Sequence, residues 1–375
     1  MKKNPVFAFV MAGGSGERFW PMSRRSTPKH LLKLLGDQTL LETTVRRLDG
    51  VVPLVNTFVL TNEAQMESTR AAVPFLPPGN IIAEPAKRDT APACALATAI
   101  ARLLHPEAVC VVLPADAMIH DVAKFRDRLA DAVDAAASGA IVTIGIPPAF
   151  PATGYGYLET AEALPGSSRG GRLHALKRFV EKPDLEKATS YVSEGNFFWN
   201  AGIFVWQAGT FLDESRRQVP ALADFIEALN DISDLPQLLT DRFASLPKIS
   251  VDYAIMENAR QISSVIADFD WDDVGAWTAL PAHIPPDAEG NSKRGLVVQH
   301  SSRDNIAISN GRLIALCGVD HLVVVETPDA ILVCDRDSVQ QVKELQAATD
   351  RVYVDRSVLE YAVNLVLCTR TPENF

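Results

Sequence analysis

Short hydrophobic runs alternate with longer amphipathic stretches over residues 1–280. Runs rich in β-branched and aromatic residues predict strands at Val6–Val10, Thr57–Leu60, Val109–Leu113 and Ala140–Ile144. The helical spacing of apolar positions predicts helices at Gln38–Leu48 and Ala91–Leu104. Strands that alternate with helices in this way are typical of an α/β domain built on a mainly parallel sheet.

The run VCVVLPAD at 109–116 predicts a central strand of that sheet. Its apolar residues occupy both the odd and the even positions, as expected for a strand that is covered on both faces. Asp116 follows the strand directly. We therefore expect it at the carboxyl edge of the sheet, where open α/β sheets bind their ligands.

The pattern changes after the proline-rich segment PAHIPPDAEG at 281–290. This segment predicts a boundary between a first domain over residues 1–283 and a second over 290–375. The second domain begins with short strand-like runs: GLVVQ, NIAIS, GRLIAL, HLVVVE and AILVC. Asn310-Gly311 predicts a hairpin between two of them. Helices are expected at Ser338–Ala348 and Ser357–Cys368, so the second domain is predicted to be β-rich with terminal helices.

The charge of the chain narrows the class of partner. The formal net charge is −10 over 375 residues, which argues against nucleic acid or an anionic membrane, since both favour basic surfaces. No apolar run approaches the ~18 residues that a membrane span requires. The five cysteines are dispersed, which indicates a reducing compartment.

The N-terminal residues allow two interpretations. The apolar run after MKKN could be a weak secretory signal or a first strand. It ends in glycines and has no small-residue cleavage site, which favours the strand. We therefore expect a cytoplasmic protein.

Three glycines, Gly13, Gly14 and Gly16, follow the first predicted strand, and Arg18 and Lys29 follow the glycines. The P-loop pattern GxxxxGK[ST] and the dinucleotide pattern GxGxxG both fail here. Glycines let backbone N–H groups approach phosphate oxygens, and Arg18 and Lys29 would supply positive charge. A solvated basic turn is the alternative. The spacing of the two cations after a strand favours a phosphate site.

This segment resembles the signature GGxGxRxxPxxxxxPK of the sugar-1-phosphate nucleotidylyltransferases. Further blocks are similar to one branch of that family, the mannose-1-phosphate guanylyltransferases. In chain order they are EPAKRDTAPA, VVLPADAMI, IGIPPAFPATGYGYLE, FVEKPD, FFWNAGIFVW, ISVDYAIME and WDDVGAW. The resemblance spans residues 7–277 and is weaker in the β-rich C-terminal part.

The resemblance implies a GT-A-like, Rossmann-like catalytic domain and a small C-terminal domain that is left-handed β-helix-like in relatives. It implies that GTP and α-D-mannose 1-phosphate react to give GDP-mannose and pyrophosphate, with Mg²⁺. The sugar phosphate is already anionic, so the chemistry reduces to positioning and charge neutralisation. The resemblance further implies that the second domain could form a homodimer interface, as in some members of the family.

The resemblance also assigns residues to sites. Arg18, Lys29, Asp116 and Asp273 would be catalytic, and the two aspartates would bind the metal, since Mg²⁺ prefers oxygen ligands. The residues implied in nucleotide binding are Ala12, Gly13, Gly14, Ser15, Gly16, Glu84, Arg88, Asp89 and Pro114. Those implied in binding the sugar phosphate are Gly154, Glu181, Lys182, Asn200 and Gly202.

The chain departs from the family pattern at several positions. Asp89 stands where the family usually has Asn, and a carboxylate suits the two adjacent donors of guanine, so we expect Asp89 to favour guanine if it faces the base. His30-Leu31 replaces the usual Gln-Phe, and Ala117 replaces a common His. His30, His105 and His120 lack metal-ligand spacing, so they are interpreted as incidental.

Two other functions remain open on this sequence. One keeps the chemistry and changes the substrates, for example glucose 1-phosphate with UTP or dTTP. The other is a non-catalytic sugar-nucleotide sensor. A sensor would be expected to lose at least one of the four catalytic residues, and all four are present.

Overall fold

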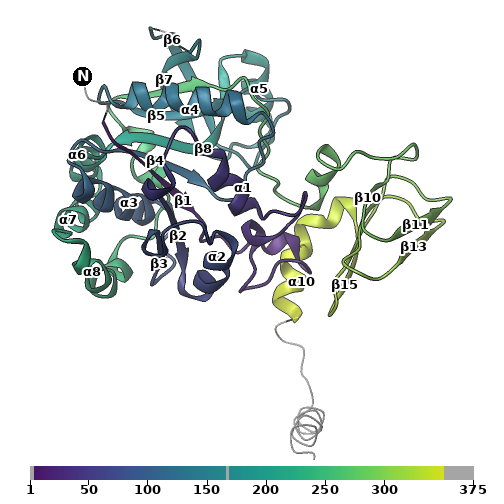
Figure 1. Ribbon diagram of the computed structural model, residues 1–375. Helices are drawn as coiled ribbons and strands as arrows, with labels where there is room; N and C mark the ends of the chain where they lie inside the picture. Colours follow the sequence, from purple (N-terminus) through teal and green to yellow (C-terminus); the bar gives the residue numbers. More distant parts are fainter. Residues whose placement is uncertain (1–3, 166–168, 350–375) are drawn as a thin grey trace, which may run out of the picture. The chain divides into compact units, whose positions relative to one another are not determined.

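The computed structural model describes residues 4–165 and 169–349, which form two compact units (Figure 1). The first unit holds residues 4–16, 22–275 and 279–285, and the second holds residues 17–21, 276–278 and 286–349. The helix expected at Ser357–Cys368 lies outside the described residues.

The first unit is built on a nine-stranded sheet with the order β3-β2-β1-β4-β8-β5-β9-β7-β6. The strands are β1 Val6–Met11, β2 Thr57–Asn62, β3 Ile81–Glu84, β4 Val109–Pro114, β5 Ile141–Ile146, β6 Tyr157–Ala163, β7 Arg172–Val180, β8 Phe197–Gln207 and β9 Ile262–Ile266. The four strands predicted from the hydrophobic runs are therefore confirmed as β1, β2, β4 and β5.

The expectation of a mainly parallel sheet is correct for only one half. Strands β3, β2, β1 and β4 are parallel to one another. Strand β8 is antiparallel to both β4 and β5, and β6 and β7 add further antiparallel pairs. One reason is that β6 and β7 follow each other directly and pair with each other, without the helical crossover that a parallel pair requires.

Helices cover both faces of this sheet. They are α1 Leu40–Arg47, α2 Met66–Ala72, α3 Thr90–Leu104, α4 Val122–Ala136, α5 Leu185–Glu194, α6 Ala208–Gln218, α7 Pro220–Ala228, α8 Leu235–Arg242 and α9 Val251–Ala254. In β1, Phe7 and Phe9 join the hydrophobic cluster of α3 and α6, whereas Ala8 and Val10 join that of α1 and α4. Alternate residues of β1 thus pack into two different hydrophobic cores, as expected for a strand that is buried on both faces.

The second unit contains two small sheets. Its strands are β10 Ser292–Arg294, β11 Val297–His300, β12 Ile306–Ile308, β13 Ile314–Cys317, β14 Leu322–Glu326 and β15 Ile331–Asp335, followed by a 3₁₀ helix at Arg336–Gln341 and α10 Val342–Thr349. Strands β10, β12 and β14 pair in parallel, as do β11 and β13, whereas β15 is antiparallel to β14. Each parallel strand pairs with the next strand but one in the sequence. The chain therefore winds in successive coils, which is a β-helix-like arrangement.

The hairpin expected at Asn310-Gly311 is wrong. Strands β12 and β13 on either side of this turn belong to different sheets. Gly311 lies at a φ of 146°, within a turn that moves the chain from one sheet to the other. Gly311 gives the turn its conformation, but the pairing partners of the strands come from neighbouring coils.

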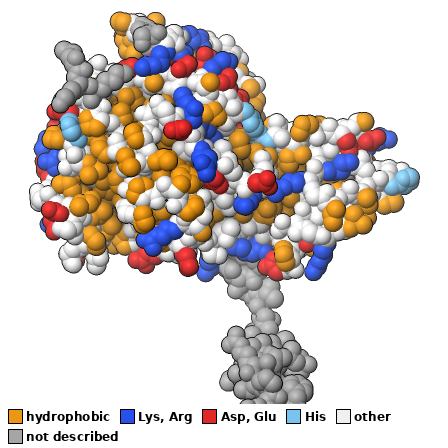
Figure 2. Space-filling view, viewed as in Figure 1, with side chains coloured by type: hydrophobic (Ala, Val, Ile, Leu, Met, Phe, Trp, Pro, Cys, Tyr) orange, Lys and Arg blue, Asp and Glu red, His pale blue; other side chains and the backbone are white. Residues whose placement is uncertain are grey.

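Acidic and basic side chains are interspersed on the face shown in Figure 2. Within residues 4–165 and 169–349, we find no helix whose length and hydrophobicity would let it cross a membrane.

Stacked asparagines connect successive coils of the second unit. Asn291 and Asn305 precede β10 and β12, and both are buried. The Nδ2 of Asn305 donates to Asn291 Oδ1 and to the Val319 carbonyl, each at 2.9 Å, and its Oδ1 accepts from Leu322 N–H at 2.9 Å. The side chain of Asn305 therefore satisfies backbone groups at the corners that the short strands leave unpaired.

Replacing Asn305 should destabilise the second unit. Asn305→Ala removes three buried side-chain hydrogen bonds and should lower the free energy of unfolding by about 3 kcal/mol. Thermal unfolding and amide exchange in β12 and β14 would measure the loss. Asn310→Ala, at an exposed position in the same unit, is the matched control. Equal stability of the two variants would contradict this role of Asn305.

Candidate active site

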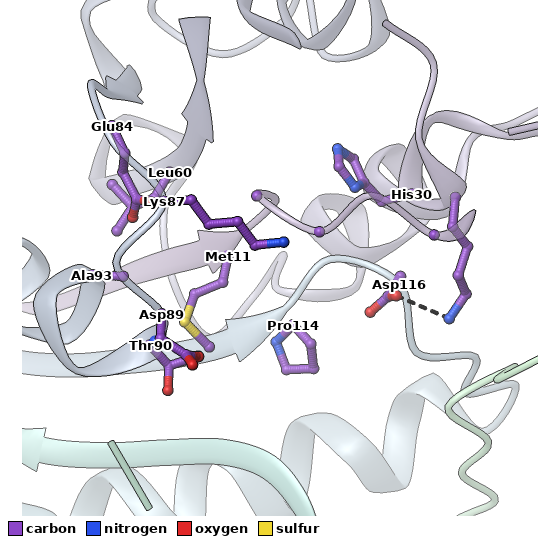
Figure 3. A pocket seen from close by; sticks show the side chains of 14 residues that line it. Met11, His30, Leu60, Glu84, Lys87, Asp89, Thr90, Ala93, Pro114 and Asp116 are labelled. Carbon is purple, nitrogen blue, oxygen red and sulfur yellow. Dashed lines mark hydrogen bonds and ion pairs between the residues drawn. The ribbon is translucent and has the colours of Figure 1, made fainter. Parts of the chain in front are cut away.

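A cavity of about 290 Å³ lies at the carboxyl edge of the sheet, beyond the ends of β1 and β4 (Figure 3). Its lining residues come from five segments that are distant in sequence: Met11, Gly13, Gly14, Gly16, Lys29, His30, Leu60, Glu84, Lys87, Asp89, Thr90, Ala93, Pro114 and Asp116. Asp116 thus lies where the hydrophobic run before it predicted. The glycine loop and Lys29 share this cavity with it.

Gly16 lets the glycine loop approach Lys29. Its φ is 61°, a conformation that side chains other than glycine rarely adopt. A Cβ at this position would collide with the Cβ of Lys29. A glycine is therefore required at position 16, because the backbone here packs directly against Lys29. Both residues belong to the signature.

Lys29 connects three segments at one end of the cavity. Its side chain is largely buried, and its Nζ lies 2.9 Å from Asp116 Oδ2. The same ammonium donates to the backbone carbonyl of Asp273. Buried charges are stable only when they are paired in this way.

Asp273 lies beside this ion pair. Burial raises the pKa of its carboxyl, while a 2.6 Å hydrogen bond from the Tyr155 hydroxyl and the nearby Lys29 ammonium oppose the rise. The charge of Asp116 contributes to the rise as well. The structure therefore brings together the two aspartates that the resemblance implied as metal ligands. Their carboxylate oxygens fit a divalent cation such as Mg²⁺.

Side chains behind the site hold the two aspartate segments. Thr44 and Arg47 of α1 donate to the carbonyls of Ala115 and Ala117, on either side of Asp116. His283 Nε2 lies 3.0 Å from Asp272 Oδ2, next to Asp273, and His283 Nδ1 lies 3.0 Å from His120 Nε2. His120 was interpreted as incidental from sequence, but it belongs to this supporting chain.

The residues implied in sugar binding form a second cluster around β8. The Lys182 N–H donates to the Tyr155 carbonyl, and the Asn200 N–H donates to the Gly156 carbonyl. This places the Gly154 loop beside Glu181 and Asn200, and Gly156 faces Glu181 so closely that a Cβ would lie 2.6 Å from its Oε2. Gly202 lies at a φ of 69°, and its N–H donates to Asn200 Oδ1.

Asp252 joins the same cluster, although the sequence analysis did not assign it. The Asn200 Nδ2 donates to Asp252 Oδ1 at 3.3 Å. Burial and the neighbouring Glu181 raise the pKa of Asp252 to about 6, and Lys182 opposes that rise. Asp252 lies within the ISVDYAIME block, so its position was visible in the sequence, but its neighbours were not.

The other end of the cavity is more apolar and contains Glu84 and Asp89 (Figure 3). Burial raises the pKa of Glu84 to about 8. Asp89 is exposed, and its Oδ1 accepts the Thr90 N–H at 3.0 Å, which caps α3. The two carboxyl groups thus lie in very different surroundings.

His30 also lines the cavity, contrary to its interpretation as incidental. The side chain is buried, and its Nε2 has no hydrogen-bond partner among the residues that the structure describes. Burial is the main cause that lowers the pKa of His30 to about 4, and Lys29 adds to the effect. The imidazole is therefore neutral at physiological pH.

Five residues implied in catalysis or nucleotide binding do not line the cavity, and Asp273, beside the Lys29–Asp116 pair, is one of them. Ala12 is buried, and its N–H and carbonyl bond to Leu60 and Thr61 of β2. Ser15 and Arg88 are likewise absent from the lining. Arg18 belongs to the second unit, in the segment 17–21.

Comparison with known proteins gives a consistent result over most of the chain. The nucleotidyl transferase family model matches residues 7–288, and a MannoseP isomerase/GMP-like β-helix domain matches residues 295–347. The mannose-1-phosphate guanylyltransferase of Escherichia coli (strain K12) is 39% identical over 92% of this chain and 73% of its own length. The xanthan biosynthesis protein XanB of Xanthomonas campestris pv. campestris (strain B100) is 38% identical over 91% of this chain and 72% of its own.

A solved structure agrees with these relatives. The crystal structure of a protein from Thermus thermophilus, described as a mannose-1-phosphate geranyltransferase, superposes with a TM-score of 0.83. It is 34% identical and covers 92% of this chain and 99% of its own. The expected fold, a Rossmann-like nucleotidyltransferase domain followed by a β-rich domain, is confirmed.

The buried His30 should make stability depend on pH. Its pKa is about 4 in the folded chain and about 6.5 when unfolded, so the unfolded state binds more protons between these values. The stability that the neutral His30 contributes is therefore fully present above the pKa of the unfolded chain, and it is lost as the pH falls below that value. Between about pH 7 and about pH 5 the loss from this group should be about 2 kcal/mol.

Denaturant unfolding of wild type and His30→Gln at the two pH values would test this. Glutamine does not titrate, so the variant should lose about 2 kcal/mol less than wild type over the same interval. A His105→Gln variant, altered at an exposed histidine, is the control and should behave as wild type does. Identical losses in wild type and His30→Gln would exclude His30 as the source.

Proposed function

The chain belongs to the nucleotidyl transferase family, and we propose that it transfers GMP from GTP to α-D-mannose 1-phosphate, forming GDP-mannose and pyrophosphate. The observation that carries the proposal is the Lys29–Asp116–Asp273 group, next to the glycine loop and within the same unit as the Asn200 cluster. The relatives named as mannose-1-phosphate guanylyltransferases support the choice of substrates.

The glycine loop and Lys29 would bind the phosphate chain of GTP. Gly13 and Gly14 line the cavity, and because they carry no side chain, their backbone N–H groups would be able to approach phosphate oxygens. Lys29 supplies positive charge at the same end, where pyrophosphate would depart. An ammonium that is already held by two segments loses little entropy when it engages the leaving group.

Asp116 and Asp273 would hold Mg²⁺. When bound, the ion would neutralise charge on the phosphate oxygens around the reacting phosphorus. Tyr155 holds the Asp273 carboxylate in place through its hydroxyl. The Lys29 ammonium already bridges the two aspartate segments. Its positive charge therefore reduces the repulsion between the two carboxylates in the free protein.

The β8 cluster would bind mannose 1-phosphate. Asn200 is fixed by Thr143 Oγ1 at 3.0 Å and by Gly202 N–H at 3.2 Å, so its orientation is set before any sugar arrives. Glu181 and Asp252 would accept hydrogen bonds from sugar hydroxyls, and Lys182 would neutralise the phosphate. The attacking oxygen is already anionic, so none of these residues has to act as a general base.

Pyrophosphate release tests the proposal directly. Wild-type protein with Mg²⁺ would be assayed with each of GTP, ATP, UTP and dTTP against the 1-phosphates of mannose, glucose and N-acetylglucosamine. We expect release mainly with GTP and mannose 1-phosphate, and its loss when EDTA removes the metal. Release with another pair would keep the chemistry and change the substrates. Silence in every combination, from folded protein that still binds GTP, would favour a sensor.

Gly16→Ala should impair this reaction strongly. The added Cβ collides with Lys29 and strains a backbone at positive φ, so both the loop and the ammonium must shift. A displacement of about 1 Å at such a site can reduce kcat/KM by about 10²-fold. Gly79→Ala is the control, because a Cβ at Gly79 meets no atom within 4 Å. Retention of wild-type kcat/KM in Gly16→Ala would show that this contact does not matter for catalysis.

A further inference from the structure

A strained turn carries Asp273 into the site. Val274 follows Asp273 directly, is fully buried and lies at a φ of 45°. This backbone conformation is unfavourable for a β-branched residue and persists only where the surroundings enforce it. Gly275 continues the turn, and a Cβ at this position would lie 3.2 Å from Asp273 Oδ2. The direction of the Asp273 carboxylate therefore depends on the groups that hold this turn.

Asp272 holds the turn with both of its carboxylate oxygens. Its Oδ1 accepts the Val274 N–H at 2.7 Å, and its Oδ2 lies 3.0 Å from His283 Nε2. The backbone of Asp272 also pairs with that of Met118, in the segment that follows Asp116, through hydrogen bonds of 2.8 and 3.0 Å. The Asp272 side chain is 26% exposed. Without His283, water could therefore compete for this carboxylate and release the Val274 N–H.

His283 connects the turn to the segment that follows Asp116. Its side chain is only 6% exposed, and its Nδ1 lies 3.0 Å from His120 Nε2. The His120 N–H in turn donates to Asp270 Oδ2 at 2.8 Å, which fixes that residue. A carboxylate only accepts hydrogen bonds, so we assign the proton of the neutral His283 ring to Nε2, facing Asp272. Nδ1 then accepts a hydrogen bond from His120.

We propose that His283 is a positioning residue for the metal site, and that it keeps the Asp273 carboxylate beside Asp116 by fixing Asp272. This inference rests on the proposed function, since it takes Asp116 and Asp273 as the ligands of Mg²⁺. His283 acts through Asp272 and the turn, and not on the ion itself. Loss of partners that orient metal ligands costs about 10- to 100-fold in metal affinity or activity.

Two amide side chains of different length separate the contacts of His283. The amide nitrogen of glutamine can occupy the position of the histidine Nε2, whereas the amide of asparagine reaches only the position of Nδ1. His283→Gln should therefore keep the donation to Asp272 and lose the contact with His120. His283→Asn should lose the donation to Asp272. Metal binding should survive in the first variant and weaken in the second.

Titration with Mn²⁺, followed through the EPR signal of the free ion, measures metal binding directly. Protein freed of metal with EDTA and then dialysed would be titrated alone and with GTP, without sugar phosphate, and a GTP blank would be subtracted. His283→Asn and His283→Ala should raise the Kd for Mn²⁺ at least about tenfold, whereas His283→Gln should stay within about threefold of wild type. His300→Asn, at an exposed histidine of the second unit, is the control and should match wild type.

Thermal unfolding of the metal-free variants separates this role from a purely structural one. A structural role would lower the Tm of the variants and leave the Kd of the folded protein unchanged. Three outcomes would overturn the inference: a wild-type Kd in folded His283→Asn, equal weakening in His283→Asn and His283→Gln, or failure of both His283→Asn and His283→Ala to fold. The absence of Mn²⁺ binding by wild type in both titrations would overturn the metal assignment as well.

Pyrophosphate release gives a second readout. In His283→Asn, the Mg²⁺ concentration for half-maximal release should rise at least about tenfold, while the KM for mannose 1-phosphate at saturating Mg²⁺ should stay within about twofold of wild type. An increase in that KM with an unchanged requirement for Mg²⁺ would contradict the inference, because the sugar cluster would then be the part affected.

The result can be separated from that of the substrate assay. The Mn²⁺ titration omits the sugar phosphate, so a difference between His283→Gln and His283→Asn would stand even if no sugar phosphate reacted. Conversely, release from GTP and mannose 1-phosphate by wild type, with unchanged Mn²⁺ binding in folded His283→Asn, would support the proposed function and overturn the role of His283.

Discussion

The contact of the Lys29 ammonium with Asp116 and with the Asp273 carbonyl is the interaction on which the site depends. Three segments far apart in sequence meet at this one group. Gly16 allows the glycine loop to reach it, and α1 holds the Asp116 segment behind it. If Lys29 were lost, the partly exposed carboxylates of Asp116 and Asp273 would repel each other without a cation nearby. The site is therefore stable before any substrate binds.

Much of the fold could be predicted from local pattern. The run at 109–114 is apolar on both alternations, and it became β4, buried on both faces with Asp116 at its end. Pairing partners could not be predicted in the same way. The Asn310-Gly311 turn has the composition of a hairpin, yet its flanking strands pair with neighbouring coils, because register in the second unit comes from stacked residues such as Asn291 and Asn305.

The candidate site shows the same division between local and long-range information. The structure places Lys29 and Asp116 in one cluster and Asn200 in another. The roles of His30, Glu84 and Asp252 depend on what surrounds them, and burial is the main cause of all three pKa shifts. Spacing along the chain carries no information on burial by residues from other elements.

Strand β8 lies between the parallel half of the sheet and the strands of the sugar cluster. It pairs with β4 on one side and with β5 and β6 on the other, and it carries both Asn200 and Gly202. Backbone hydrogen bonds therefore connect the strand that precedes Asp116 to the strand that positions Asn200. One consequence concerns divergence within this architecture. Under the proposed function, substitutions in the loops around β6 and β7 would alter which sugar phosphate is accepted, while the nucleotide half of the sheet stays unchanged.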